Sequence, residues 1–391
     1  MKRFETFNDV IHPVEFEDFV SNYFEQKPFV IKRNQPDYYE PVLTITDIDR
    51  ILRNNNLDSE GFELVKYSQQ LNKSKFTCSD INTGKNVIDH KKLFGFFDEG
   101  FTINVDQFHR YHRPLNRLVD MTVRTFYGDS NAYLFYTPAG MQGLKPHWDQ
   151  VDVFILQIEG SKEWRVYDSP MKLPRTTEGF DNMDKEPILT AVLEKGDMLY
   201  MPRGFVHEAK SGNDISVHIT LSCSIKTYGD LFKSMVADIA DEYFDQSLPV
   251  RFNVDSDDFR ARIKDYVATL DINEVIGKFR KDFFDKKVLQ STGIFIQNSG
   301  LDTHVKLKKK LAGPYSVKCD NLQLTLACST GASIVFPVFA KVCIEFILEA
   351  EVFSVNEIPS DLSEQKMLMI CKKLIHEGIL EVLHPDVISF Y

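Results

Sequence analysis

The sequence contains no C-x-x-C pair, although it has six cysteines, at positions 78, 223, 319, 328, 343 and 371. This absence excludes the usual zinc knuckles and dithiol redox motifs, and scattered thiols are typical of a reducing compartment. Long apolar runs are also absent, because the most apolar stretch, residues 332–348, is interrupted by Pro337, Lys341 and Glu345. The segment Met1 to Asn8 lacks the apolar core of a signal peptide. We therefore expect a soluble, cytoplasmic protein with no membrane partner.

The sequence also lacks an excess of basic residues. It has 46 lysines and arginines against 57 aspartates and glutamates, which gives a formal net charge of −11. Proteins that hold nucleic acid through its phosphates usually carry a basic surface, so nucleic acid is not an expected partner. An acidic body can instead attract a basic polypeptide. The length of 391 residues and the 43% hydrophobic content predict a globular chain of two or three domains.

The first predicted domain, residues 1–228, is mainly β-structure. A helix from Val14 to Glu25 and a strand from Pro28 to Arg33 are expected near its start. Short apolar strands separated by glycine and proline are then predicted at residues 132–137, 152–158, 163–167, 198–201 and 216–222. Many short strands with such punctuation favour a β-sandwich or barrel.

The second predicted domain, residues 229–303, is helical. Apolar residues recur at three- and four-residue spacing from Leu231 to Phe244 and from Phe259 to Leu270. These wide, aromatic-rich stripes have two interpretations. One is an ordinary intramolecular core, and the other is a helical dimerisation domain that makes the protein a homodimer.

The third predicted domain, residues 304–391, mixes strands and helices. A helix from Leu362 to His376 ends at Gly378, and Ile379 to Leu383 is predicted to be a closing strand. This order suits a small α+β unit of the winged-helix kind. The last helix offers few lysines against several carboxylates, so we expect a structural or protein-binding role for this unit.

The most informative motif is His147-x-Asp149. On an extended strand, residues i and i+2 project from the same face. The imidazole and the carboxylate are therefore predicted to lie side by side as two ligands of one metal ion. His207 is the candidate third ligand, because it follows a strand framed by Gly196 and the Pro202-x-Gly204 turn.

Two histidines and one carboxylate form a facial triad that leaves half of an octahedral metal ion open. The open positions let Fe(II) bind a chelating co-substrate and O2, which a closed four-ligand zinc site cannot do. The alternative is that His147 and Asp149 only hydrogen-bond within a loop, since a lone H-x-D is common. The framed His207 in the same β-rich region favours the metal site.

These motifs carry a family resemblance. Gly196-x5-Pro202-x-Gly204-x2-His207 resembles the second cupin motif, with Ser211 at the position where that motif usually ends in asparagine. Together with the upstream H-x-D, it resembles the JmjC-type 2-oxoglutarate oxygenases and, among these, the ribosomal oxygenases. The resemblance covers about residues 130–230 and is carried by Thr137-Pro-Ala-Gly-Met-Gln-Gly143, Pro146-His147-x-Asp149, Val153-Phe-Ile-Leu-Gln-x-Glu159-Gly160, Trp164-Arg-Val-Tyr167, Pro202-Arg-Gly-Phe-x-His207 and His218-x-Thr220-Leu-Ser222.

The resemblance implies a double-stranded β-helix of the cupin/JmjC type, which binds Fe(II), the co-substrate 2-oxoglutarate and O2. It implies that Lys162 meets the distal carboxylate of 2-oxoglutarate and that the Ser222 hydroxyl assists. Thr220 and His218 share the strand face of Ser222 and are either pocket-lining or ordinary core residues. Tyr133 stands where relatives often carry asparagine, and its hydroxyl is the candidate replacement donor to 2-oxoglutarate.

The resemblance also implies a polypeptide substrate, namely a histidine or arginine side chain of a ribosomal protein, and an enzyme that hydroxylates it. Three alternatives stay open. The same chemistry can act on a natural-product precursor peptide or on another protein, lysine demethylation would need a cage that no motif marks, and a non-catalytic cupin scaffold would only bind partners.

Overall fold

The computed structural model describes residues 4–53, 57, 59–81, 83–179, 186–237, 243–249, 254–286, 301–309, 315–328 and 333–383. The chain divides into two compact units, Met1–Lys226 and Thr227–Tyr391. Within the described residues, no helix is long and apolar enough to traverse a lipid bilayer.

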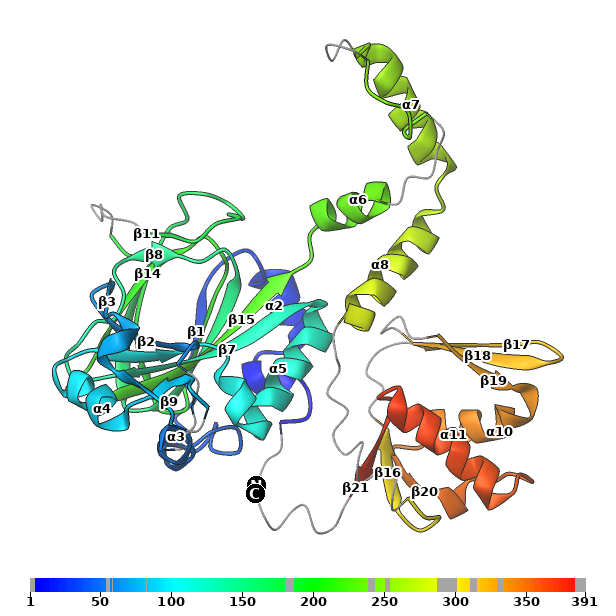
Figure 1. The fold of residues 1–391 in the computed structure, drawn as a ribbon, viewed down its shortest axis with the longest axis horizontal. Coiled ribbons are helices and arrows are strands. Elements are labelled where there is room, and N and C mark those ends of the chain that lie inside the picture. Colours follow the sequence, from blue (N-terminus) through cyan, green and yellow to red (C-terminus); the bar gives the residue numbers. More distant parts are fainter. Residues whose placement is uncertain are drawn as a thin grey trace. The chain divides into compact units, whose positions relative to one another are not determined.

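Two antiparallel sheets that face each other form the N-terminal unit (Figure 1). Among the described residues, the larger sheet has eight strands, in the order β1 (Phe29–Ile31), β13 (Met198–Met201), β9 (Asp152–Glu159), β15 (Ser216–Ile225), β7 (Gly128–Thr137), β6 (Thr102–Val105), β2 (Phe62–Lys66) and β3 (Gln69–Gln70). The smaller sheet has the order β11 (Glu178–Gly179), β8 (His147–Trp148), β14 (Val206–Ser211), β10 (Ser161–Tyr167) and β12 (Leu189–Glu194). The predicted β-barrel architecture is confirmed, and a separate hairpin pairs β4 (Thr77–Ser79) with β5 (Asn86–Ile88).

Strand β9 shows why these residues form the centre of the larger sheet. It is buried from Asp152 to Ile158 on both faces, as expected for a near-continuous apolar strand in a covered sheet. Val153 and Ile155 point toward the space between the sheets and line a pocket there. Phe154 points the other way and packs against Phe19, with ring centroids 5.7 Å apart.

Helices cover the outer face of the larger sheet. They are α1 (Asn8–Ile11), α2 (Phe16–Asn22), α3 (Ile45–Leu52), α4 (His90–Asp98) and α5 (Arg113–Phe126), with short 3₁₀ turns η1 (Lys73–Lys75) and η2 (Phe108–Tyr111). The predicted helix at 14–25 is the shorter α2, which ends at Asn22 because Tyr23 has a φ of −129° and leaves the helical conformation. The predicted strand at 28–33 is β1.

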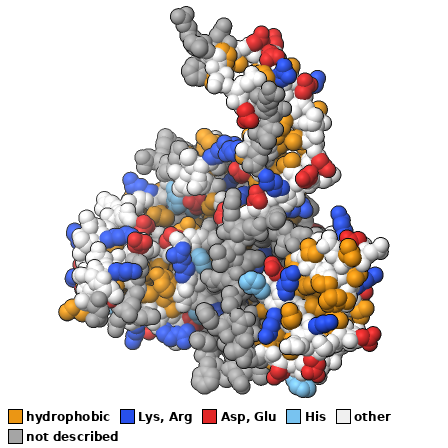
Figure 2. Space-filling view, turned by 45° about the vertical axis from the view of Figure 1, so that its right-hand side comes forward, with side chains coloured by type: hydrophobic (Ala, Val, Ile, Leu, Met, Phe, Trp, Pro, Cys, Tyr) orange, Lys and Arg blue, Asp and Glu red, His pale blue; other side chains and the backbone are white. Residues whose placement is uncertain are grey.

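The C-terminal unit begins with helices α6 (Tyr228–Ala237), α7 (Ser256–Thr269) and α8 (Ile272–Lys286). The predicted helical stripe at 231–244 coincides with α6 as far as residue 237, and residues 238–242 lie outside the described residues. No described residue of α6 or α7 is buried. Figure 2 shows apolar side chains of the C-terminal unit at its surface, among charged ones.

The rest of this unit has its own hydrophobic core. Two three-stranded antiparallel sheets contain β16 (Lys306–Lys309), β20 (Val352–Ser354) and β21 (Leu380–Leu383), and β17 (Tyr315–Cys319), β18 (Gln323–Cys328) and β19 (Ser333–Pro337). Two helices, α10 (Lys341–Glu349) and α11 (Glu364–His376), and the turns η4 (Val338–Ala340) and η5 (Val355–Glu357) complete it. Buried residues such as Leu307, Ile344 and Leu374 join these elements in one cluster. The predicted last helix and closing strand are α11 and β21.

Candidate metal centre and co-substrate pocket

His147 and His207 lie directly opposite each other in the smaller sheet. They are the register partners that join β8 to β14, and their ring centroids are 4.3 Å apart. Cross-strand partners project from the same face of a sheet, so residues 60 positions apart in the sequence present their imidazoles to one point. Asp149 follows β8, and its Oδ2 lies 3.8 Å from His207 Nε2.

The three side chains form a group whose ligand atoms all lie within 4.8 Å of one another. Each histidine places Nδ1 next to a backbone carbonyl oxygen, at 2.8 Å from Lys145 for His147 and 3.1 Å from Phe205 for His207. A carbonyl can only accept, so both Nδ1 atoms must carry the proton and both Nε2 atoms keep a free lone pair. Two neutral imidazole nitrogens and one carboxylate are a donor set that fits a divalent iron-type ion.

Burial shifts the pKa values of His207 and Asp149 from their usual values. It lowers the pKa of His207 well below the usual histidine value, and the neighbouring His147 adds to this effect, so that His207 is neutral at physiological pH. Burial raises the pKa of the Asp149 carboxyl, because a buried negative charge is costly. A divalent ion between the three groups would supply the missing positive charge.

Glycine fixes the turn that brings His207 to the H-x-D segment. The backbone N–H of Gly204 donates to the carbonyl oxygen of Asp149 at 2.9 Å. Gly204 has a φ of +90°, and a Cβ there would lie 2.7 Å from the carbonyl oxygen of Met171. Only glycine can adopt this positive φ and also leave space for the Met171 carbonyl oxygen without strain. This explains the Gly-framed pattern of the sequence.

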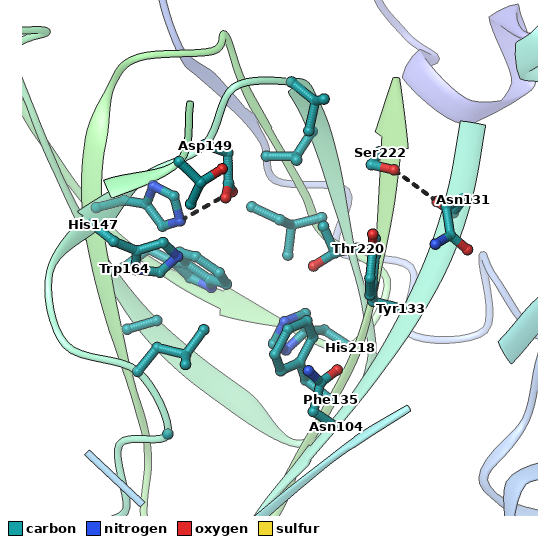
Figure 3. Close-up of a pocket in the computed structure, with 18 of the residues that line it drawn as sticks. Asn104, Asn131, Tyr133, Phe135, His147, Asp149, Trp164, His218, Thr220 and Ser222 are labelled. Carbon is teal, nitrogen blue, oxygen red and sulfur yellow. Dashed lines mark hydrogen bonds and ion pairs between the residues drawn. The ribbon is translucent and has the colours of Figure 1, made fainter. Parts of the chain in front are cut away.

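A pocket of about 480 Å³ opens beside the three ligands, between the two sheets. Figure 3 shows His147 and Asp149 on one side of it, Ser222 and Asn131 on the other, and His218 beside Phe135 at the lower end. All four residues expected to bind the co-substrate line this pocket, and they are Lys162, Ser222, Tyr133 and Thr220.

Lys162 projects from β10 and is only 4% exposed. Its Nζ donates to Thr137 Oγ1 at 3.2 Å, and Thr137 Oγ1 also accepts from Thr102 at 3.3 Å. Within the described part of the chain, Lys162 has no carboxylate partner. Burial lowers the pKa of Lys162 to about 7, because the ammonium loses its hydration. The pocket therefore holds a cation site that lacks its anion.

The wall opposite the metal ligands is a ladder of cross-strand pairs between β7 and β15. Tyr133 lies opposite Thr220, and Asn131 lies opposite Ser222, whose hydroxyl donates to the Asn131 carbonyl oxygen at 3.3 Å. Burial raises the pKa of Tyr133, so its phenol stays protonated. The asparagine amide expected at position 133 is thus present two residues earlier in β7, at Asn131. The sequence analysis missed this residue.

Two further residues near the metal centre were not predicted as ligands or pocket donors. Glu208 lines the pocket next to His207 and accepts from Tyr167 OH at 2.9 Å and from Gln142 Nε2 at 3.1 Å. Ser211, at the position of the cupin asparagine, is buried and accepts from the N–H of Met141 at 2.9 Å. Ser211 therefore anchors the loop after β7.

Comparison with protein families matches residues 106–231 to the JmjC domain. Most of the matched residues lie in the N-terminal unit, which ends at Lys226. This match covers β7, the three candidate ligands and the ladder opposite them. The JmjC/cupin fold expected from the motifs is therefore confirmed.

Curated proteins have sequences similar to that of this chain. The bifunctional lysine-specific demethylase and histidyl-hydroxylase NO66 of Dictyostelium discoideum is 32% identical over 286 residues, which cover 71% of this chain and 53% of that protein. Ribosomal oxygenase 2 of Mus musculus is 33% identical over 258 residues, which cover 60% of this chain and 52% of that protein. The chain spans about half the length of these two relatives.

Solved structures show the same fold over nearly the whole chain. The Escherichia coli ribosomal oxygenase YcfD has a TM-score of 0.54 and 16% identity, with 95% of this chain and 98% of that chain covered. A structure of YcfD in complex with cobalt and 2-oxoglutarate has a TM-score of 0.55 and 15% identity, with 95% and 99% covered. At this identity the likeness extends to the fold alone.

Proposed function

We propose that the chain is an Fe(II)- and 2-oxoglutarate-dependent oxygenase that hydroxylates a histidine or arginine side chain of a ribosomal protein. The observation that carries the proposal is the convergence of His147, Asp149 and His207 beside a pocket that also contains the buried Lys162, which has no carboxylate partner within the described residues. The two relatives are named as a bifunctional lysine-specific demethylase and histidyl-hydroxylase and as a ribosomal oxygenase, which supports the same reaction class here.

In this proposal, His147 Nε2, Asp149 and His207 Nε2 hold Fe(II). Bound Fe(II) and 2-oxoglutarate supply the oxidising chemistry, in which one atom of O2 enters a substrate C–H bond and 2-oxoglutarate leaves as succinate and CO2. The Lys162 ammonium receives the distal carboxylate and so fixes the orientation of the co-substrate. Ser222, Thr220 and the protonated Tyr133 offer hydroxyl groups along the opposite wall.

The charge of the pocket lining supports a basic or donor-rich substrate side chain. Lys162 at the floor is the only lysine or arginine that lines the pocket within the described residues. The rest of the polar lining consists mainly of carboxylates, amides and hydroxyls, including Asp129, Asn131 and Glu208. These groups accept hydrogen bonds from an imidazole or a guanidinium, and the net charge of −11 favours approach of a basic ribosomal segment.

The test is turnover of the purified chain with Fe(II), 2-oxoglutarate and candidate ribosomal peptides. We expect succinate formation and a peptide mass increase of one oxygen atom, and loss of both in Asp149→Ala. A mass decrease of one methyl group would indicate lysine demethylation instead. Oxygen transfer only to a natural-product precursor or another protein would keep the chemistry and change the substrate. A non-catalytic scaffold would give no succinate with any peptide.

We further propose that the chain has three domains, residues 1–228, 229–303 and 304–391, and works as a cytoplasmic homodimer through its helical domain. The described faces of α6 and α7 leave Phe232 53% and Phe259 41% exposed, which supports a second copy as their cover. The antiparallel sheet β20–β16–β21 packed with α10 and α11 supports a winged-helix-like third domain. Its role is expected to be structural or protein-binding.

A further inference from the structure

Among the described residues that line the pocket, His218 is a buried titratable group to which the proposed reaction gives no task. It projects from β15, opposite Phe135 of β7, and is only 2% exposed. Its ring stacks on Phe135 with centroids 4.9 Å apart and planes at 9°, and the two rings lie together in Figure 3. Its edge meets Trp164 at 5.5 Å and 77°. Two aromatic rings therefore fix the imidazole in place.

This imidazole has an unmet hydrogen-bonding need. Nδ1 of His218 is buried and has no hydrogen-bond partner among the described residues. Buried polar groups in native proteins nearly always have a partner, and an exception calls for a ligand, a water molecule or an ion. If His218 served only to pack the core, an apolar ring could fill the same space without leaving a buried nitrogen unpaired.

His218 and Lys162 face the same part of the pocket. Both line it, and both lie against the same indole, with Lys162 Nζ 5.9 Å from the centroid of Trp164. The positive charge of Lys162 and, more strongly, burial lower the pKa of His218 well below its usual value, so the ring is neutral. A buried lysine and a neutral imidazole thus line the same part of the pocket, and within the described residues no carboxylate pairs with the lysine.

We propose that His218 is a second anchor for the distal carboxylate of the co-substrate, through a ring N–H that donates to one carboxylate oxygen while Lys162 binds the carboxylate as a cation. This inference rests on the proposed function, because it assumes that 2-oxoglutarate is the ligand. It assigns to the stacked pair of His218 and Phe135 the role of orienting the co-substrate. A carboxylate with two donors from different strands has less rotational freedom than one with a single lysine.

The test compares His218→Phe with His218→Gln in the Mn(II)-loaded full chain, by calorimetric titration with 2-oxoglutarate. Phenylalanine keeps the stack on Phe135 and removes both nitrogens, whereas glutamine keeps a donor. Loss of a hydrogen bond to a charged group predicts a Kd raised about 10- to 100-fold in the phenylalanine variant. The glutamine variant should recover part of this loss, and Mn(II) affinity should not change.

The matched ligand control is 2-oxopentanoate, which has the same carbon chain without the distal carboxylate. Its affinity should be equal in the wild type and in His218→Phe, whereas a merely structural role of His218 would weaken both ligands alike and overturn the inference. Should the phenylalanine variant fail to fold, a crystal structure of the wild type with Mn(II) and 2-oxoglutarate decides. A ring nitrogen beyond hydrogen-bond distance of the carboxylate overturns the inference.

The two proposals fail in different ways. If wild-type protein does not bind 2-oxoglutarate, the proposed function itself is wrong. If wild-type protein binds it and His218→Phe binds it equally well, only the role of His218 is wrong.

Discussion

Lys162 is a buried cation with no carboxylate partner within the described residues. The residue is 4% exposed, its Nζ donates to a neutral hydroxyl, and burial lowers its pKa to about 7. A buried charge without a partner is unfavourable, so part of the free protein carries a neutral lysine near neutral pH. An entering carboxylate would restore the charged form, because the ion pair favours the ammonium.

Co-substrate binding should therefore take up a proton and weaken as the pH rises. Above pH of about 7, the charged fraction of Lys162 in the free pocket falls about tenfold per pH unit, and the Kd for 2-oxoglutarate should rise by the same factor. Calorimetric titration between pH 7 and about pH 9 in buffers of different ionisation enthalpy measures both effects. Lys162→Ala should raise the Kd by orders of magnitude and abolish the slope. A flat pH profile in the wild type would contradict the assigned role.

The sequence was sufficient to name the three side chains that converge in the structure, but not all residues of the pocket. His147, Asp149, His207 and Lys162 stand at spacings that strand geometry and the JmjC resemblance make recognisable. Asn131 was missed because the predicted strand starts at residue 132, whereas β7 begins at Gly128. Its position opposite Ser222 depends on the register of β7 and β15, which involves residues far apart in the chain.

At the scale of elements, the turn between β9 and β10 controls where Lys162 points. Gly160 in this turn has a φ of +63°, and a Cβ there would lie 1.8 Å from the carbonyl oxygen of Ile215. The backbone of the turn therefore approaches the start of β15 more closely than any side chain permits. Strand β10, which carries Lys162 and Trp164, begins directly after it.

Gly160→Ala should destabilise the protein and displace Lys162. The matched control is Gly84→Ala, because Gly84 has a similar φ of +69° but no atom within 4 Å of an added Cβ. In both variants the alanine must adopt a left-handed backbone conformation. The difference between their free energies of unfolding therefore measures the effect of the collision with Ile215 alone. We expect the free energy of unfolding of Gly160→Ala to fall by about 2 kcal/mol or more beyond that of the control. Urea denaturation measures both, and equal losses would refute the collision.

Element prediction succeeded for short apolar strands bounded by glycine and proline. The strands predicted after residue 130 correspond to β7, β9, β10, β13 and β15. Helix α5 was not predicted, although Leu115, Leu118 and Val119 mark its buried face and proline stands in its first turn. The apolar spacing and the proline formed a local helix signal that the sequence analysis did not use.

At the scale of the whole molecule, the proposed homodimer follows from α6 and α7, in which none of the described residues is buried within one chain. We expect light scattering to give a mass about twice 45.2 kDa for the full chain. Phe259→Asp should raise the dissociation constant of the dimer about 30-fold or more, because it places a charge in an apolar contact.

The neighbouring change Arg260→Asp is the control for this variant, since Arg260 is a charged, exposed residue of the same helix. It should leave the mass unchanged. A wild-type mass near 45.2 kDa would count against the homodimer.

The opposition of His147 and His207 across β8 and β14 has a consequence for assembly of the fold. A slip of one residue in a strand sends every side chain to the other face of the sheet. A chain with this slip would keep its full sequence and still present only one imidazole to the pocket. A metal ion that binds both imidazoles would thus stabilise the correctly paired sheet relative to its shifted alternatives.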